Sequence, residues 1–151
     1  MPKLITTLVG LAAVVALAGC GGDDGGGSGG TDISKAAFIS QANQVCAQGS
    51  AELATAMAGA DVSSQEGIEK AIEEVLVPNI RQQVADIRAI GFPSADAAML
   101  DQVFDDAEAL LDQMADDPSA LTDPSASDPF EEVNSKLTEY GLGTCGQSNT
   151  G

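Results

Sequence analysis

The sequence predicts an all-α fold: a four-helix antiparallel bundle-like domain with one helix kinked at a proline and its ends tied by a disulfide. Three observations predict it. Apolar residues recur at intervals of three and four along much of residues 34–146. No segment alternates convincingly between apolar and polar residues, as a half-buried strand would. Helix start and stop signals divide the stretch into four amphipathic segments with short connections, which pack most simply as an antiparallel bundle.

Residues 1–19 precede this domain and have the features of a secretory signal peptide. Lys3 is followed by an uncharged stretch that ends in small residues. The stretch is a little short for a membrane-spanning helix, which needs roughly 20 apolar residues. An ordinary secreted protein with a chance cysteine and an uncleaved membrane anchor are the alternatives.

The segment LAGC, residues 17–20, resembles the bacterial lipoprotein box. In that box a diacylglycerol is attached to the cysteine thiol, and cleavage follows just before the cysteine. The resemblance implies that Cys20 is the lipidated N-terminus of the mature chain, anchored to the outer face of the cell membrane. Residues 20–33 would then be the lipidated cysteine and a flexible Gly-rich tether, whose reach is about 20 Å.

Two cysteines remain if Cys20 carries the lipid, namely Cys46 and Cys145. Outside the cytoplasm an even number of remaining cysteines favours a disulfide, and two cysteines allow only one pairing. The alternative is a pair of buried free thiols.

The first two helices are predicted from caps and stripes. Ser34 is a plausible N-cap for a helix with an apolar stripe that includes Cys46. Ser63 and Glu66 have capping-box spacing and predict the second helix start. Pro78 predicts a kink or brief break near Val77, because proline lacks an amide proton and clashes with the preceding turn.

The last two helices follow a GFP segment at residues 91–93. The third is predicted to begin near Ser94 and to end before the loop 116–128. The fourth begins with Asp128 as N-cap and Pro129 at the first helical position, and Gly141 ends it. The tail then carries Cys145 back to the first helix, and residues 147–151 are predicted to be disordered. Small core side chains predict close helix approach and little room for a large pocket.

Composition excludes several classes of chemistry. The net charge is −17, with 23 acidic and 6 basic residues, so nucleic acid and anionic lipid are poor partners. The chain has no histidine, which removes imidazole-based triads and nearly all transition-metal sites with nitrogen ligands. We therefore predict no catalytic residue, no metal ligand and no cofactor.

Acidic residues cluster in two kinds of place that could form a site. The adjacent pairs 73–74, 105–106 and 131–132 are expected on exposed helix faces, where they are better explained as solvated surface than as a catalytic pair. Four aspartates around the loop could supply oxygen ligands to calcium, but their spacing does not match the twelve-residue calcium loop. The neighbouring prolines and the capping role of aspartate explain most of this clustering. The four aspartates are Asp116, Asp117, Asp123 and Asp128.

Three segments resemble small lipid-anchored proteins of actinobacteria: SKAAFISQANQVCAQGSAEL (34–53), VLVPNIRQQVADIRAIGFP (75–93) and NSKLTEYGLGTCG (134–146). In those proteins an early and a late cysteine appear in this order, within similar motifs. Ala37 departs from the pattern, since a glutamate is expected there. The family is uncharacterised, so the resemblance implies an envelope location and supports the disulfide but supplies no active site.

The sequence thus predicts a membrane-anchored extracytoplasmic lipoprotein with a non-catalytic helical binding or scaffolding domain. Its partners would be the membrane, through the diacylglycerol on Cys20, and an envelope protein or a small apolar ligand. A more specific form of the binding hypothesis is that the domain carries a small apolar ligand. A carboxylate-dependent envelope enzyme is the alternative from another class.

Overall fold

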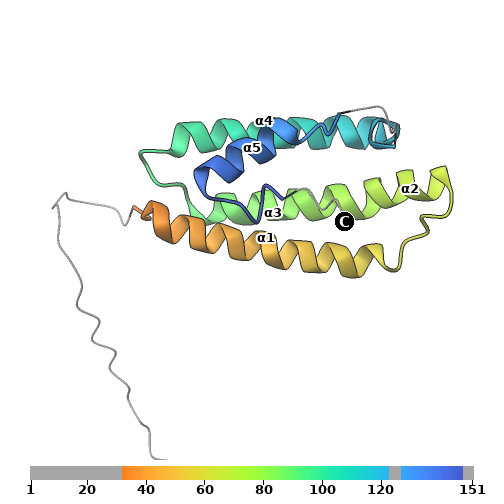
Figure 1. The fold of residues 1–151 in the computed structure, drawn as a ribbon, viewed down its shortest axis with the longest axis horizontal. Helices are drawn as coiled ribbons and strands as arrows, with labels where there is room; N and C mark the ends of the chain where they lie inside the picture. The colour runs from red at the N-terminus through yellow and green to blue at the C-terminus, as the bar shows by residue number, and fades with distance from the viewer. Residues whose placement is uncertain (1–31, 123–126, 148–151) are drawn as a thin grey trace, which may run out of the picture. The chain divides into compact units, whose positions relative to one another are not determined.

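The computed structural model describes residues 32–122 and 127–147 of the chain. These residues form four helices and no strand, which confirms the all-α prediction (Figure 1). The second helix is built from three consecutive segments, one of them a π-helical turn, and a 3₁₀ turn follows the third helix. The elements in chain order are α1 (Lys35–Met57), α2 (Gln65–Ala71), η1 (Ile72–Leu76), α3 (Val77–Ile90), α4 (Ala97–Asp116), η2 (Pro118–Leu121) and α5 (Glu131–Tyr140).

Helix α1 begins where the sequence predicts. The Ser34 hydroxyl accepts a hydrogen bond from the Ala37 amide at 3.2 Å, so the cap forms without a glutamate at position 37. Its buried residues follow a three- and four-residue spacing, which turns one face of the helix toward the core. They are Phe38, Ala42, Cys46 and Gly49.

The second helix begins one residue later than predicted. Ser64 is the N-cap, and its hydroxyl accepts from the Gly67 amide at 3.1 Å. Ser63 instead bonds Asp61, whose carboxylate accepts from both the Ser63 amide and its hydroxyl. The capping box at Ser63 and Glu66 is therefore wrong, because Asp61 offers Ser63 a local partner in the preceding turn.

Pro78 does not break the helix. The π-helical turn η1 comes directly before α3, and the Val77 amide bonds the Ile72 carbonyl five residues back. Proline cannot donate a hydrogen bond to the residue four positions earlier, and its ring would crowd that carbonyl in a regular α-helix. The wider π turn accommodates this, so the expected break is a change of helical register in a continuous helix.

Helix α4 begins at Ala97, later than the predicted start near Ser94. The Ser94 amide and hydroxyl both donate to the Asp32 carboxylate, so Ser94 ties the α3–α4 connection to the segment before α1. Ile33 packs against the main core. Asp32 and Ile33, the last residues of the expected tether, thus contact the helical domain.

Helix α5 begins at Glu131 with Phe130 as its N-cap, so the prediction of Asp128 as N-cap and Pro129 as first helical residue is wrong. Both residues lie in the turn before the helix, because the Asp128 carboxylate accepts from the Phe130 amide at 2.8 Å and closes that turn. The helix ends at Gly141, where φ is +113°. The Leu142 amide donates to the Leu137 carbonyl and the Gly141 amide to the Thr138 carbonyl, which is a Schellman motif. The predicted glycine stop is confirmed.

The helices pack in chain order, α1 against α3, α3 against α4 and α4 against α5. Arg88 of α3 joins α4 through three carboxylates, at 2.6 Å from Asp105, 3.1 Å from Asp101 and 3.5 Å from Glu108. Arg81 adds an ion pair with Asp112 at 2.6 Å. The two arginines thus meet acidic residues of a neighbouring helix.

The buried residues form two clusters. The larger gathers residues of α1, α3, α4, α5 and the tail, and its Phe104 stacks on the partly buried Phe92 with ring centroids 5.6 Å apart. The smaller lies farther along α4 and consists of Ile72, Val77, Leu111 and Met114. Both clusters draw on the second helix and α4, so these two helices connect the two parts of the core.

The tail after α5 returns to α1. Cys46 and Cys145 form a disulfide with Cα atoms 5.1 Å apart, which joins positions 99 residues apart in sequence. Asn43 supports this contact, because its side chain donates to the Gly141 carbonyl and accepts from the Thr144 amide, both at 3.0 Å. The ends of the helical domain are thereby tied together.

None of the helices in the described ranges combines the length and the apolar character that crossing a bilayer requires. The predicted signal peptide 1–19, Cys20 and residues 148–151 lie outside the residues that the structure describes.

Candidate functional site: an apolar pocket between the two core clusters

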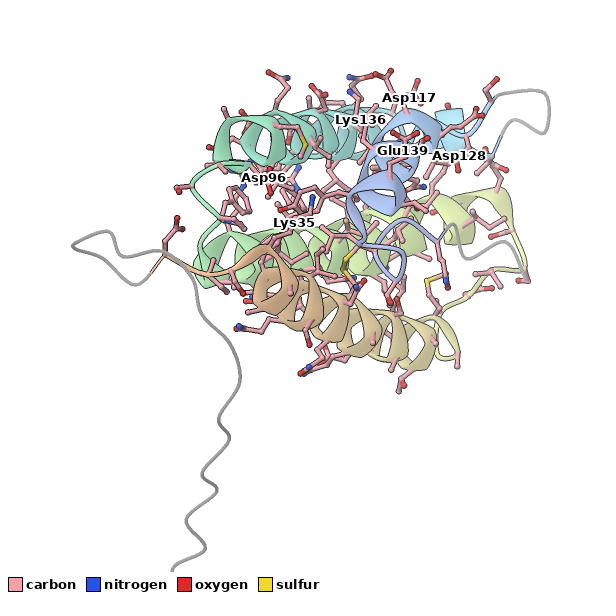
Figure 2. All side chains as sticks on the ribbon, turned by 60° about the vertical axis from the view of Figure 1, so that its left-hand side comes forward. Lys35, Asp96, Asp117, Asp128, Lys136 and Glu139 are labelled. Atoms are coloured by element: carbon pink, nitrogen blue, oxygen red, sulfur yellow. A yellow bond between two sulfur atoms is a disulfide. The ribbon has the colours of Figure 1, made fainter. Side chains whose placement is uncertain are left out.

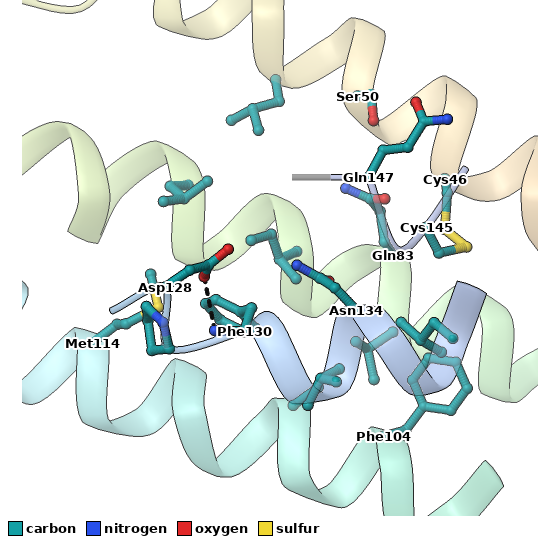
Figure 3. A pocket seen from close by; sticks show the side chains of 18 of the residues that line it. Cys46, Ser50, Gln83, Phe104, Met114, Asp128, Phe130, Asn134, Cys145 and Gln147 are labelled. Atoms are coloured by element: carbon teal, nitrogen blue, oxygen red, sulfur yellow. Dashed lines mark hydrogen bonds between the residues drawn. A yellow bond between two sulfur atoms is a disulfide. The ribbon is translucent and has the colours of Figure 1, made fainter. Parts of the chain in front are cut away.

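A pocket of about 520 Å³ lies among α1, the second helix, α4, α5 and the tail (Figure 3). Its lining combines residues of the larger cluster, such as Phe104 and Val133, with residues of the smaller one, such as Met114. The pocket therefore lies where the two clusters meet. Its volume falls within the range of about 300–1,000 Å³ that is usual for small-molecule sites.

The length of α5 explains why there is space here. Helix α5 has 10 residues and α4 has 20, so α5 spans about half of the length of α4 at 1.5 Å per residue. Val133 and Leu137 of α5 pack into the larger cluster, whereas Leu53, Leu76 and Leu121 line the pocket and stay partly exposed. The prediction of little room for a large pocket is wrong because it considered side-chain size and not helix length.

The interior of the pocket is apolar. Aliphatic and aromatic side chains come from four helices, and the disulfide contributes its sulfur-containing side chains. They are Cys46, Leu53, Leu76, Ile80, Val84, Ile87, Phe104, Ala107, Met114, Leu121, Pro129, Phe130, Val133, Leu137 and Cys145. A surface of this kind favours contact with an apolar molecule over contact with water.

Uncharged polar side chains lie at the side of the pocket nearest the disulfide. Figure 3 shows Ser50, Gln83 and Gln147 gathered there. Gln83 is held in place, because its amide donates to Asn79 at 2.7 Å and Asn79 donates to the Gly49 carbonyl at 3.1 Å. Gly49 permits this arrangement, since a Cβ there would collide with the Gln83 side chain.

Asp128 lies on the opposite side in Figure 3, near Met114 and Phe130. It carries the only charge among the described residues that line the pocket. Its carboxylate accepts from the Phe130 amide and so holds the chain at the entry to α5. Asp128, which the sequence predicted as a helix cap, is instead a turn residue that lines the pocket.

The predicted disulfide residues are brought together at the pocket, and Cys46 and Cys145 both line it. Sequence reasoning did not find the polar residues Ser50, Gln83 and Gln147. Ser50 and Gln83 sit at the edges of helical stripes and resemble ordinary surface residues in the sequence. Gln147 falls in the tail that was predicted to be disordered.

The acidic pairs lie mainly on helix surfaces, as expected. Glu73, Glu74, Glu131 and Glu132 are exposed. Asp105 bonds Arg88, and Asp106 lies 3.5 Å from the Lys136 ammonium. These positions agree with the solvated-surface interpretation.

The aspartates of the loop 116–128 do not converge where the structure describes them. No group of three potential ligands able to hold a metal is present among the described residues. Asp117 caps η2 by accepting from the Ser119 amide, and Asp128 accepts from Phe130. Asp123 lies outside the described residues.

A second polar group, away from the pocket, joins α1, α4 and α5 (Figure 2). The buried Tyr140 hydroxyl donates to Asp96 at 2.7 Å, and the Lys35 ammonium lies 3.8 Å from the centre of the Tyr140 ring. Lys35 also lies 3.9 Å from Asp96. Burial raises the pKa of the Tyr140 phenol, and the hydrogen bond to Asp96 and that carboxylate's charge raise it further.

Comparisons with protein-family models, curated proteins and solved structures found no match to this chain.

Proposed function

We propose that this chain is a lipid-anchored protein of the cell envelope whose helical domain binds a small, largely apolar molecule in the pocket. In this proposal the four helices form an antiparallel bundle, and the short α5 leaves its centre accessible at one side. The observation that carries the proposal is the pocket of about 520 Å³ with its apolar lining. The binding is non-catalytic, and the bound molecule is held and released unchanged.

The anchor is supported by sequence and by cysteine usage. The lipoprotein box at 17–20, the apolar stretch before it and the Gly-rich segment after it together favour lipidation at Cys20. The Cys46–Cys145 disulfide is typical of an oxidising compartment outside the cytoplasm. The resemblance to actinobacterial lipoproteins points to the same location.

Ligand binding can be tested by native mass spectrometry of the full chain, extracted from membranes without detergent. The matched variants are Ser50→Phe and Ser40→Phe, both on α1. Ser50 lines the pocket, while Ser40 is exposed and does not line it. We expect a discrete added mass on the native chain and on Ser40→Phe but not on Ser50→Phe, where the ring fills the pocket. The same added masses on all three chains, or none on any, would contradict the proposal.

The anchor has a separate test, in cells that process lipoproteins. Cys20→Ala should remove incorporation of labelled fatty acid and membrane retention, whereas Cys46→Ala should retain both. If Cys20→Ala still incorporates the label, the assignment of the lipid to Cys20 is wrong.

A further inference from the structure

We infer that the pocket selects an amphiphile with an uncharged polar end and discriminates against anionic amphiphiles of the same chain length. This inference rests on the proposed function and adds the chemical class of the ligand. The carrying observation is the set of polar groups around an apolar interior. Ser50, Gln83 and Gln147 gather on one side, Asp128 lies on the other with Ser127 next to it in the chain, and no cation is found among the described lining residues.

The uncharged side determines where the polar end lies. Ser50, Gln83 and Gln147 can each donate and accept hydrogen bonds, as can the lining residue Thr144. A hydroxyl, ester or amide on the ligand would take the place of solvent water at these groups. A pure hydrocarbon would displace that water without replacing its hydrogen bonds, which is costly for polar groups that become buried.

The apolar chain then extends away from the disulfide. Leu76, Ile80 and Met114 line the pocket beyond the polar group, and they belong to or pack against the smaller core cluster. Contact with these side chains buries the apolar surface of the ligand and supplies most of the favourable free energy of binding.

Charge excludes an anionic end. A carboxylate, phosphate or sulfonate normally pairs with arginine or lysine when it is taken out of water, and no such side chain is found in the described lining. Asp128, on the opposite side of the same pocket, adds a repulsive charge that the apolar interior screens less than water would. The net charge of −17 on the chain acts in the same direction.

The test uses the full chain reconstituted in phosphatidylcholine vesicles and two photoactivatable probes. One is a monoacylglycerol and the other an alkyl sulfonate, both with the same diazirine-bearing chain. Peptide mapping locates the label, and the amount on lining residues is taken relative to that in Ser50→Phe, which corrects for different membrane partitioning. We expect the uncharged probe to label the lining at least about tenfold more than the sulfonate.

Two aspartate variants test the source of the selectivity. Asp128→Asn keeps a side-chain oxygen that can accept from the Phe130 amide and removes the charge. Asp117→Asn makes the same change at a capping aspartate that does not line the pocket. The ratio of labelling by the uncharged probe to labelling by the sulfonate should decrease in Asp128→Asn and stay unchanged in Asp117→Asn. An unchanged preference in Asp128→Asn would overturn the assignment of selectivity to that carboxylate.

The remaining outcomes separate this inference from the proposed function. Equal labelling of the lining by both probes, or stronger labelling by the sulfonate, would overturn the uncharged-ligand inference and leave the pocket as a binding site. Labelling of the lining by neither probe would overturn the inference and the proposed function together.

Discussion

Tyr140 shows how one side chain can depend on three helices at once. It ends α5, donates a hydrogen bond to Asp96 at the start of α4, and lies beneath Lys35 of α1. It is the only tyrosine in the chain. Its ionisation can therefore be followed without interference from any other phenol.

The raised pKa of Tyr140 predicts a loss of stability at alkaline pH. Below the ordinary pKa of 10.0 the phenol is protonated in both states, and its contribution is fully present. As the pH rises above 10, the unfolded chain loses this proton first, and the free energy of unfolding falls. The fall continues until the pH passes the folded-state pKa, with a slope of at most about 1.4 kcal/mol per pH unit for one proton.

Denaturant unfolding between about pH 8 and pH 11 measures this effect, with Tyr140→Phe as the comparison. The variant should be less stable at pH 8 by about 1 kcal/mol, because it loses the hydrogen bond to Asp96. The difference between the two proteins should shrink as the pH rises, since only the native chain has this proton to lose. A difference that stays constant up to pH 11 would contradict the assignment.

The role of a single residue was predictable where it depends only on the backbone groups of its own helix. Ser34 caps α1 and Gly141 ends α5 as expected, because each satisfies backbone groups of its own helix. Ser94 and Asn43 were not predictable in the same way. Ser94 bonds Asp32, and Asn43 bonds Gly141 and Thr144. These partners are distant in sequence and become neighbours only after the helices have packed.

The path of the tail from α5 back to α1 depends on how α5 ends at Gly141. Gly141 adopts φ of +113°, and a Cβ at this position would lie 2.9 Å from Cδ1 of Ile39. Gly143, two residues later, would place its Cβ in open space. The two glycines thus form a matched pair within one turn of chain.

Gly141→Ala should lower the free energy of unfolding by about 1–3 kcal/mol, because alanine is strained at positive φ and also contacts Ile39. Gly143→Ala should change it by less than about 0.5 kcal/mol. Thermal or denaturant unfolding of both variants gives the comparison. Equal losses in the two would show that the αL cap is not what holds the end of α5.

The helices themselves could be predicted better than the irregularities in them. Apolar periodicity identified all four helices, because burial of one face determines helix formation. Pro78 was expected to kink or briefly break the second helix, and the structure places the π turn η1 directly before it in a continuous helix. A proline excludes a regular α-helical turn, but whether a break or a π turn replaces it depends on packing on both sides.

The disulfide acts on the whole domain, because it closes a loop across 99 positions of the sequence. In the chain-entropy model such a link stabilises the folded state by at most about 4–5 kcal/mol. Cys46→Ala and Cys145→Ala should each lower the melting temperature substantially. The double variant should be no worse than either single variant, since all three remove the same bond.

Thiol titration under denaturing, non-reducing conditions provides the accompanying check. A Cys20→Ala background ensures that any free thiol comes from Cys46 or Cys145. We expect no free thiol in this background, whereas two per chain would contradict the pairing and the end-to-end contact built on it.

The pocket is the feature of the whole molecule that the sequence did not predict. Its existence depends on the relative lengths of α4 and α5 and on how the tail crosses to α1, which are properties of the assembled helices. Its apolar lining was predictable in kind, because most of those residues lie on the predicted stripes. Its polar side was not, since Ser50 and Gln83 face the pocket only through the particular rotation of their helices.

The most direct test of the central claim is whether an uncharged amphiphile enters this pocket. The chain contains no tryptophan, so a single introduced tryptophan is a unique fluorescent reporter. Phe130→Trp places it in the lining, and Val62→Trp places it at an exposed position, 52% accessible, that does not line the pocket. The full-length variants, in vesicles of unbrominated lipid, are titrated with a monoacylglycerol carrying bromine on its chain. We predict saturable quenching of Phe130→Trp and none beyond the background in Val62→Trp, whereas equal, unsaturable quenching of both would contradict the account.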